Sequence, residues 1–255
     1  GFGDFQCALA LTSGILGALY RREKTGLGDK VTVNLYHVAC WAQQIGLAST
    51  QFGDVWPKSR KAAATPTNNT YMAGDGTWFV LCMGSSDTYF PLIMHILGLD
   101  HLIDDERYNT LAVMNSTGTN KDVIRWMEEA FAKHDFDYWE KVFKENNVAY
   151  HKLYYFSDIL EDEEAYANDI LRKLPYDEFG EKALATSPIR LESVGDPILY
   201  RSRPIGYDTR EVMLQYGYTD EDVDALIADG VVKCYEGEEL GETALKPSYG
   251  PDSIC

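Results

Sequence analysis

Residues 5–22 constrain the fold of this chain most strongly, because apolar side chains occur on nearly every face of the helix that they predict. A helix with this pattern is buried on most of its surface and needs several neighbouring elements to cover it. Gly14 and Gly17 allow another backbone to approach the helix closely. We expect the apolar run at residues 5–20 to be too short and too polar to span a bilayer, and we therefore predict a core helix.

The sequence begins at Gly1, without an initiator methionine, directly before this apolar helix. A helix that is apolar on most faces requires a sheet or another layer to pack against. We therefore expect the chain to be the carboxy-terminal part of a larger protein, whose preceding half lies in the same polypeptide or in a second chain.

The composition is that of an ordinary globular protein, with 45% hydrophobic and 25% charged residues among 255. The formal net charge of −17 argues against nucleic acids and anionic membrane surfaces as partners, because both bind clustered Lys and Arg. The five cysteines form no C-x-x-C pair, and the five histidines have no partners at ligand spacing. We therefore expect no metal site, no disulfide framework and a reducing, cytoplasmic location.

The pattern that follows the first helix predicts an α/β fold. Val31, Val33 and Leu35 alternate with polar residues, which predicts a strand at residues 30–35. A second buried helix is expected at residues 36–49. Glycine, proline and charged residues interrupt the pattern from residue 51 onward, so residues 51–70 are predicted to be a linker and a candidate active-site loop.

The remainder is predicted to form a small α+β domain at residues 71–168 and a further part at residues 169–255. Thr119 and Asp135 are the expected N-caps of two helices in the small domain, and Thr219 is the expected cap of a later helix that Gly230 ends. The predicted elements are strands at residues 77–83 and 189–192 and helices at residues 87–97, 120–133, 136–145, 209–216 and 220–229, before an acidic arm from residue 236.

Asp4 is the candidate catalytic residue. It follows Gly3 at the start of the buried helix, where unpaired backbone N–H groups point toward its carboxylate. One interpretation is a plain helix N-cap, a role in which aspartate is common. The other is a reactive carboxylate, held by helix-end amides, that attacks a thioester carbonyl. The residue pattern by itself leaves both interpretations open.

Several motifs, in the same order along the chain, resemble the class III coenzyme A transferases. The residues that carry the resemblance are Gly3-Asp4-Phe5-Gln6, Ala18-Leu19-Tyr20-Arg21-Arg22-Glu23 and Thr25-Gly26-Leu27-Gly28-Asp29-Lys30-Val31 in the central motif, Tyr71 with Asp75-Gly76-Thr77-Trp78 at the small-domain entry, and residues 203–212 with Tyr216-Gly217-Tyr218 in a closing helix pair. The match is greatest to the branch that acts on aryl-lactates and branched 2-hydroxy acids.

The resemblance implies an activity and a set of site residues. Asp4 matches the catalytic aspartate of the family, and Gln6 and Ser85 are candidate substrate-binding residues. The implied reaction moves coenzyme A from an acyl-CoA to a small carboxylic acid through an aspartyl-CoA thioester. Coenzyme A esters are then substrates, and no permanently bound cofactor and no metal are expected.

The resemblance also implies an architecture. Residues 1–50 would end a Rossmann-like large domain, residues 51–70 would link it to the small domain, and residues 169–255 would return to the large domain. The implied assembly is an interlocked homodimer, with an acyl-CoA dehydratase as a further candidate partner. In the formyl-CoA transferase branch a run of glycines precedes the small-domain strand, whereas residues 61–66 of this chain contain none.

Two alternative functions remain. An α-methylacyl-CoA racemase of the same superfamily would use the aspartate as an acid/base and would need a carboxylate just after the small-domain strand. Ser85 occupies that position, and the neighbouring Ser86 also lacks a carboxylate. The second alternative is a non-catalytic subunit of an acyl-CoA dehydratase complex, which would use the acidic surface as its interface.

Overall fold

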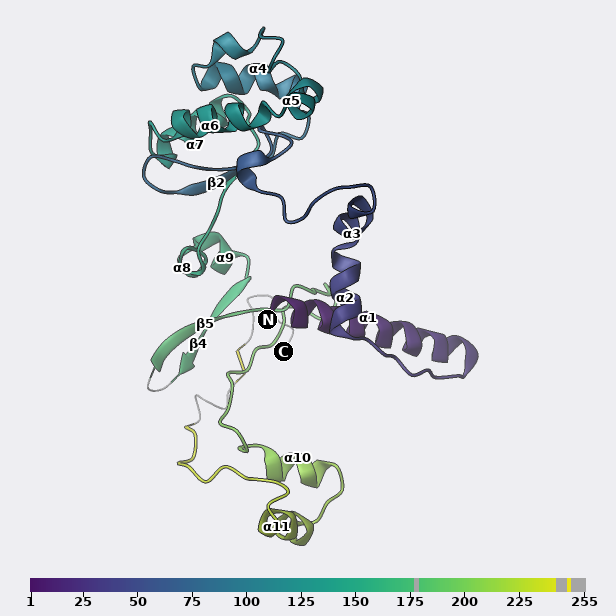
Figure 1. Cartoon of the computed structure of the whole chain (residues 1–255). Helices are drawn as coiled ribbons and strands as arrows, with labels where there is room; N and C mark the ends of the chain where they lie inside the picture. The colour runs from purple at the N-terminus through teal and green to yellow at the C-terminus, as the bar shows by residue number, and fades with distance from the viewer. Residues whose placement is uncertain (177–178, 242–246, 249–255) are drawn as a thin grey trace. The chain divides into compact units, whose positions relative to one another are not determined.

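The computed structural model describes residues 1–176, 179–241 and 247–248, and it mixes helices with two antiparallel sheets (Figure 1). The chain divides into two compact units, Gly1–Leu153 and Tyr154–Cys255. The four-part division at residues 1–50, 51–70, 71–168 and 169–255 stays a prediction.

The first unit begins with three helices, α1 (Phe2–Thr25), α2 (Leu35–Ala42) and α3 (Gln44–Thr50). α1 is longer than predicted and ends at Gly26, whose left-handed backbone (φ 74°) lets its N–H donate to the carbonyl of Arg22. α1 packs against α2. The helix predicted at residues 36–49 is broken at Gln43 into α2 and α3.

The strand predicted at residues 30–35 is wrong. Residues 30–34 have no paired strand among the described residues, although Val31 and Val33 are half-buried and alternate with exposed neighbours, as the pattern predicted. α2 begins at Leu35 because Asn34 caps it, with its side-chain oxygen accepting a hydrogen bond from the His37 N–H at 2.8 Å. An alternating sequence forms a strand only where another strand pairs with it.

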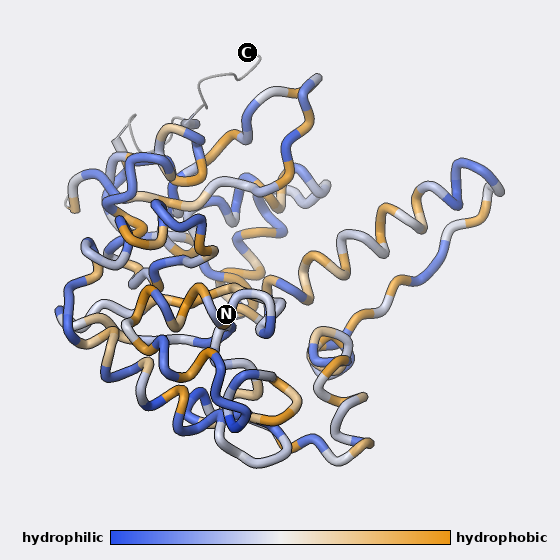
Figure 2. Tube along the Cα trace, turned by 90° about the horizontal axis from the view of Figure 1, so that it is seen from above, coloured by the Kyte–Doolittle hydropathy of each residue, from blue (hydrophilic) through white to orange (hydrophobic). Residues whose placement is uncertain are grey.

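None of the three helices has a buried residue in this structure, even though hydrophobic residues recur along α1 up to its charged last turns (Figure 2). Phe5 is 72% exposed and Leu16 is 60% exposed. The burial predicted for α1 is therefore not supplied by the described residues. By length and composition alone α1 could also cross a membrane, so the prediction that its apolar run is too short is wrong. Core helices of soluble proteins also meet this criterion of length and composition.

The compact part of the first unit is a three-stranded antiparallel sheet covered by helices, called here the small fold. The strands β1 (Thr70–Met72), β2 (Trp78–Leu81) and β3 (Tyr150–Lys152) lie in the order β1-β2-β3, with Tyr71 opposite Phe79. Its helices are α4 (Ser86–Ile96), α5 (Leu111–Thr117), α6 (Asn120–Phe131) and α7 (Phe136–Glu145), with 3-10 turns at Arg60–Ala62 and Asp100–Leu102.

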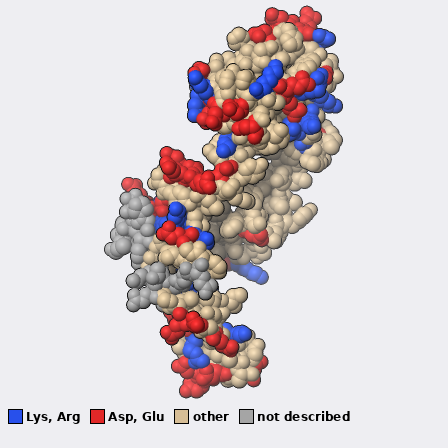
Figure 3. All heavy atoms as spheres, turned by 90° about the vertical axis from the view of Figure 1, so that its left-hand side faces the viewer, with Lys and Arg blue, Asp and Glu red and all other residues tan. Residues whose placement is uncertain are grey.

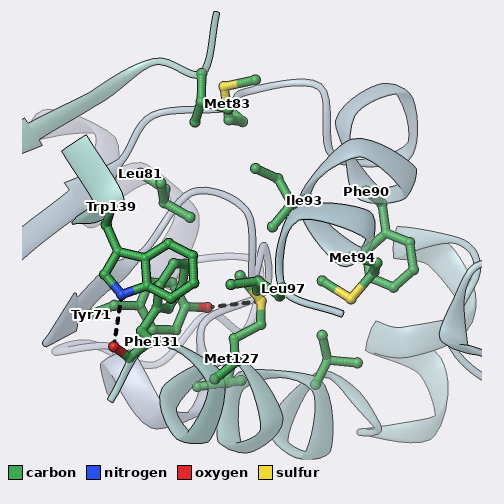
Figure 4. Close-up of a cluster of buried hydrophobic side chains, with 14 of the residues drawn as sticks. Tyr71, Leu81, Met83, Phe90, Ile93, Met94, Leu97, Met127, Phe131 and Trp139 are labelled. Carbon is green, nitrogen blue, oxygen red and sulfur yellow. Dashed lines mark hydrogen bonds between the residues drawn. The ribbon is translucent and has the colours of Figure 1, made fainter. Parts of the chain in front are cut away.

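An aromatic core joins the sheet to α6 and α7 (Figure 4). The Phe79 ring lies 5.0 Å from that of Phe131 and 5.5 Å from that of Phe143, within the range of favourable aromatic pairs. Trp139 is buried without an unpaired polar atom, because its ring N–H donates to the Phe131 carbonyl at 2.8 Å. Burial of each such ring stabilises the fold by about 1.5–3 kcal/mol.

Three predicted helices of the small fold are confirmed within a few residues, as α4, α6 and α7. Asp135 caps α7 as predicted, accepting a hydrogen bond from the Tyr138 N–H at 2.9 Å. Thr119 is the N-cap residue of α6 as predicted, but its hydroxyl makes no cap bond and instead donates to the Arg107 carbonyl at 2.9 Å.

The second unit contains a two-stranded hairpin and several short helices: α8 (Phe156–Leu160), α9 (Glu163–Ala167), β4 (Leu171–Tyr176), β5 (Gly180–Ala185), α10 (Thr209–Gln215) and α11 (Asp220–Ala228). The predicted helix pair is confirmed as α10 and α11. Thr219 caps α11, accepting from the Asp222 N–H at 3.2 Å, and Gly230 follows with φ 68°. Figure 3 shows acidic side chains gathered around this helix pair.

Two other predictions for the second unit differ from the structure. The strand predicted at residues 189–192 is wrong, since Leu191 makes only an isolated bridge to Gly195. The β4–β5 hairpin was not predicted. Of the acidic arm predicted from residue 236, residues 242–246 and 249–255 lie outside the described residues.

Candidate functional site

Asp4 is the third residue of α1 and lies three positions after the N-cap. The N-cap is Gly1, and it makes no side-chain hydrogen bond. The plain cap interpretation of Asp4 is therefore wrong. Its carboxylate is exposed and accepts no hydrogen bond from the described residues. A negative charge in the first helical turn is favoured by the helix dipole, which places partial positive charge there.

Gln6 lies two residues further along α1 and lines a different surface. It is half-buried in a groove of about 530 Å³ that α1 forms with α2 and the segment before it. Two residues correspond to a rotation of about 200° on a helix of 3.6 residues per turn, so Asp4 and Gln6 project from nearly opposite faces. The residues that line the groove are Gln6, Leu9, Ala10, Ser13, Thr32, Val33, Asn34, His37, Val38, Trp41 and Ala42.

The face of α1 that carries Asp4 continues as an apolar stripe. Leu11 and Ile15 follow Asp4 at intervals of seven and eleven residues, which keeps them on one side of the helix. Both line a second groove, of about 340 Å³, together with Val31 of the segment that follows α1. The carboxylate thus stands at one end of an apolar surface.

Ser85 belongs to the small fold, at the N-cap position of α4. It is exposed, its side chain makes no cap bond to the helix backbone, and its hydroxyl lies 2.9 Å from that of Thr88. No hydrogen bond or ion pair joins it to Asp4 or Gln6 within the described ranges of the chain. The structure therefore does not bring the three predicted site residues together by direct contacts.

Sequence reasoning missed the polar group that holds the start of α4. The buried Thr67 hydroxyl contacts the Ser86 hydroxyl at 3.2 Å and the Met83 carbonyl at 3.2 Å. A single threonine in a linker carries no pattern that could have indicated this contact. Among the residues that the structure describes, no three His, Cys, Asp or Glu side chains are grouped closely enough to hold a metal ion.

The family model described as CoA-transferase family III matches residues 1–209, which include α1, the small fold and the β4–β5 hairpin. The chain belongs to CoA-transferase family III. The family predicted from the motifs around Asp4 and Tyr71 is thereby confirmed.

Two similar relatives are named CoA-transferases. The cinnamoyl-CoA:phenyllactate CoA-transferase of Clostridium sporogenes is 33% identical over 232 residues, which are 90% of this chain and 56% of the relative. The (R)-2-hydroxy-4-methylpentanoate CoA-transferase of Clostridioides difficile is 29% identical over 233 residues, 91% of this chain and 58% of the relative. The chain thus spans somewhat more than half the length of these relatives.

A solved structure has a fold similar to that of this chain. A CaiB/BaiF family protein from Brucella suis superposes with a TM-score of 0.65 over 84% of this chain and 55% of that protein. The sequences are 20% identical, so this likeness concerns the fold alone.

Proposed function

We propose that this chain carries the nucleophile of a CoA-transferase and that the nucleophile is the carboxylate of Asp4. The observation that carries the proposal is the match to CoA-transferase family III, which begins at residue 1 and so includes the first turn of α1. The exposure of the Asp4 carboxylate, without a hydrogen-bond partner in the described part of the chain, supports a reactive role over a structural one.

The proposed reaction has four steps in which bonds and charges balance. The Asp4 carboxylate attacks the thioester carbonyl of an acyl-CoA, and the C–S bond breaks to give a mixed anhydride and CoA thiolate. The thiolate attacks the Asp4 carbonyl, forming an aspartyl-CoA thioester and releasing the donor acid. The acceptor carboxylate then attacks this thioester, which releases CoA thiolate and forms a second mixed anhydride between Asp4 and the acceptor. The thiolate attacks the acceptor carbonyl of that anhydride and forms the new acyl-CoA. The Asp4 carboxylate is regenerated, and no ATP is consumed.

The position of Asp4 suits this chemistry in two ways. Asp4 lies in the first turn of α1, where the helix dipole places partial positive charge that would stabilise negative charge developing beside it. The apolar stripe through Leu11 and Ile15 offers a surface that, when covered, excludes water from the anhydrides, which hydrolyse readily.

We propose a 2-hydroxy acid with an aromatic or branched side chain as the acceptor. The support is the similarity to relatives named for phenyllactate and for (R)-2-hydroxy-4-methylpentanoate. The Ser85 hydroxyl is proposed to bind this acid, because a hydroxyl can donate to a carboxylate and accept from a hydroxyl. Gln6 projects from nearly the opposite face of α1 to Asp4, so the structure gives no support to its predicted role in the same site.

We also propose that the working form is a cytoplasmic, interlocked homodimer. The exposed apolar side chains of α1 to α3 support this, because leaving large apolar groups in water forfeits about 1.5–3 kcal/mol for each. Residues outside this sequence or a second copy would cover them.

The test is a transfer assay with isotopically labelled CoA on the full-length protein and its Asp4→Asn variant. The variant keeps the size of the side chain but removes the nucleophilic charge, and we expect kcat to fall by about 10³-fold or more. Asp104→Asn is the matched control, since Asp104 is exposed and makes no side-chain hydrogen bond with the described residues. Transfer by Asp4→Asn at the rate of the control would contradict the proposal.

A further inference from the structure

Residues 60–66, which we name the strap, are fastened to the small fold through their backbone. Three carbonyls of the strap each accept a hydrogen bond from a buried side chain outside it. A buried amide or hydroxyl that loses its partner is costly, so these bonds resist breaking. The pairs are Asn69 Nδ2 to the Arg60 carbonyl at 2.8 Å, Asn120 Nδ2 to the Ala63 carbonyl at 2.8 Å, and the Tyr71 hydroxyl to the Pro66 carbonyl at 2.7 Å.

Side chains fasten the beginning of the strap as well. Arg60 forms an ion pair with Glu128 on α6, and both side chains are about one-third exposed. The guanidinium of Arg60 also lies 4.7 Å from the centre of the Trp78 ring on β2, within the range of a cation–π contact. The strap is therefore held by both the helical layer and the sheet.

The preceding segment, residues 51–58, is fastened to α3 instead. The Trp56 ring N–H donates to the Ser49 hydroxyl at 3.0 Å. Lys58 pairs with Asp54 at 3.3 Å, and its ammonium lies 4.9 Å from the Trp56 ring. These contacts tie the segment together as far as Lys58.

Ser59, just before the strap, is bonded to the first residues of the strap. Its hydroxyl accepts from the Lys61 N–H at 3.3 Å, and its carbonyl accepts from the Ala62 N–H at 3.0 Å. The two sets of contacts therefore meet between Lys58 and Ser59.

We propose that the connection between α3 and β1 is a two-anchor hinge, in which residues 51–58 move with α3, the strap moves with the small fold, and bending is confined to Lys58 and Ser59. Hinges of this kind are a few residues whose backbone dihedrals absorb the whole change. Because the strap and the small fold then move as one body, the surface that they form together is the same at every hinge angle. This inference goes beyond the proposed transferase activity and does not depend on it.

Hydrogen exchange of the full-length protein, resolved to single amides, tests the hinge. We expect the amides of Lys58 and Ser59 to exchange near the rate of an unfolded chain, and those of Lys61 and Ala62 to be protected. Asn120→Ala should speed exchange at Lys61 and Ala62 by roughly three- to tenfold, which is the effect of one lost hydrogen bond. It should leave the amide of Gly53, which donates to the Thr50 carbonyl, unchanged.

Asn115→Ala is the matched control, because Asn115 is exposed on α5 and has no side-chain hydrogen bond with the described residues. It should leave the strap amides unchanged. If Asn120→Ala also loosens the Leu81 amide of β2, Tyr71→Phe replaces it. That variant removes only the hydroxyl, which donates to the Pro66 carbonyl and also contacts the Met127 sulfur at 3.4 Å. The proposal is overturned if Lys61 and Ala62 exchange as fast as Lys58, or if the strap variants change Gly53 and the strap equally.

Discussion

The backbone N–H of Gly74 donates to the carbonyl oxygen of His134 at 2.7 Å, which joins the β1–β2 turn to the segment between α6 and α7. Asp75 strengthens this junction, because its carboxylate accepts hydrogen bonds from the Thr77 N–H at 3.0 Å and the Phe136 N–H at 3.4 Å. Burial acts to raise the pKa of Asp75, but hydrogen bonds from the Thr77 N–H, the Phe136 N–H and the Thr77 hydroxyl together lower it.

Gly74→Ala should destabilise the small fold by about 1–3 kcal/mol, as overpacking does elsewhere. The reason is that a Cβ at Gly74 would lie 2.6 Å from the Ala132 carbonyl oxygen and 3.0 Å from that of His134. Gly84→Ala is the control, because its Cβ would have no neighbour within 4 Å, and we expect a change below about 0.5 kcal/mol. Urea unfolding measures both, and equal losses in the two variants would contradict the packing argument.

Asp169→Asn should destabilise the second unit by about 3–5 kcal/mol, because it leaves the buried Arg172 without a counter-charge. The Arg172 guanidinium donates to both oxygens of Asp169, at 2.9 and 2.6 Å. Hydrogen bonds from Arg172, and then from Arg190, hold the pKa of Asp169 below its ordinary value of 3.8.

The sign of the pH dependence follows from that lowered pKa. The carboxylate contributes its stability above the unfolded-state pKa, and the contribution is lost as pH falls from 3.8 toward the lower folded-state value. Unfolding free energy measured from pH 7 down to pH 3 should therefore fall less steeply in Asp169→Asn than in the parent protein or in Asp104→Asn. Parallel curves of unfolding free energy against pH for all three proteins would show that Asp169 is not the source of the pH dependence.

The sequence could predict those elements whose signals are local. α7 was predicted to the residue because Asp135 caps it and its apolar residues recur at helical spacing. The strand prediction for residues 30–35 failed because a strand needs a neighbouring strand to pair with, and an alternating pattern does not show whether one is present. The β4–β5 hairpin was missed because Pro175, Lys173 and Lys182 are residue types that are uncommon in strands. Pairing over six residues offsets their low strand propensity.

The candidate site could be predicted only through the family resemblance. The pattern around Asp4 did not distinguish a cap from a nucleophile, and the structure places Gly1 at the cap position. The separation of Asp4 and Gln6 on opposite faces follows from the helical rotation, which is readable from the sequence once the helix is known to start before Asp4. The contacts of the strap join residues far apart in the chain, so no local signal could have indicated them.

The reaction should be transfer and not racemisation at the α-carbon. Ser85 offers a hydroxyl where the racemase branch carries a carboxylate, and the nearby Asp87 carboxylate already accepts the Leu111 N–H at 2.6 Å. A chiral 2-methylacyl-CoA incubated with the full-length protein in deuterated water should therefore gain no α-deuterium, as read by mass spectrometry. The same preparation must transfer labelled CoA, so that an inactive sample is not misread. Rapid α-exchange in a transfer-competent sample would support the racemase alternative.

Trapping of the covalent intermediate on Asp4 tests the central claim most directly. The full-length protein is incubated with acyl-CoA, quenched with hydroxylamine or borohydride, digested and mapped by mass spectrometry, with Asp4→Asn treated in parallel. Hydroxylamine should convert the thioester at Asp4 to a hydroxamate, and borohydride should reduce it to an alcohol, on the peptide that contains the first turn of α1. We predict modification at Asp4 that requires acyl-CoA and is absent from Asp4→Asn. Modification of another carboxylate, or steady transfer with Asp4 unmodified throughout, would contradict the account.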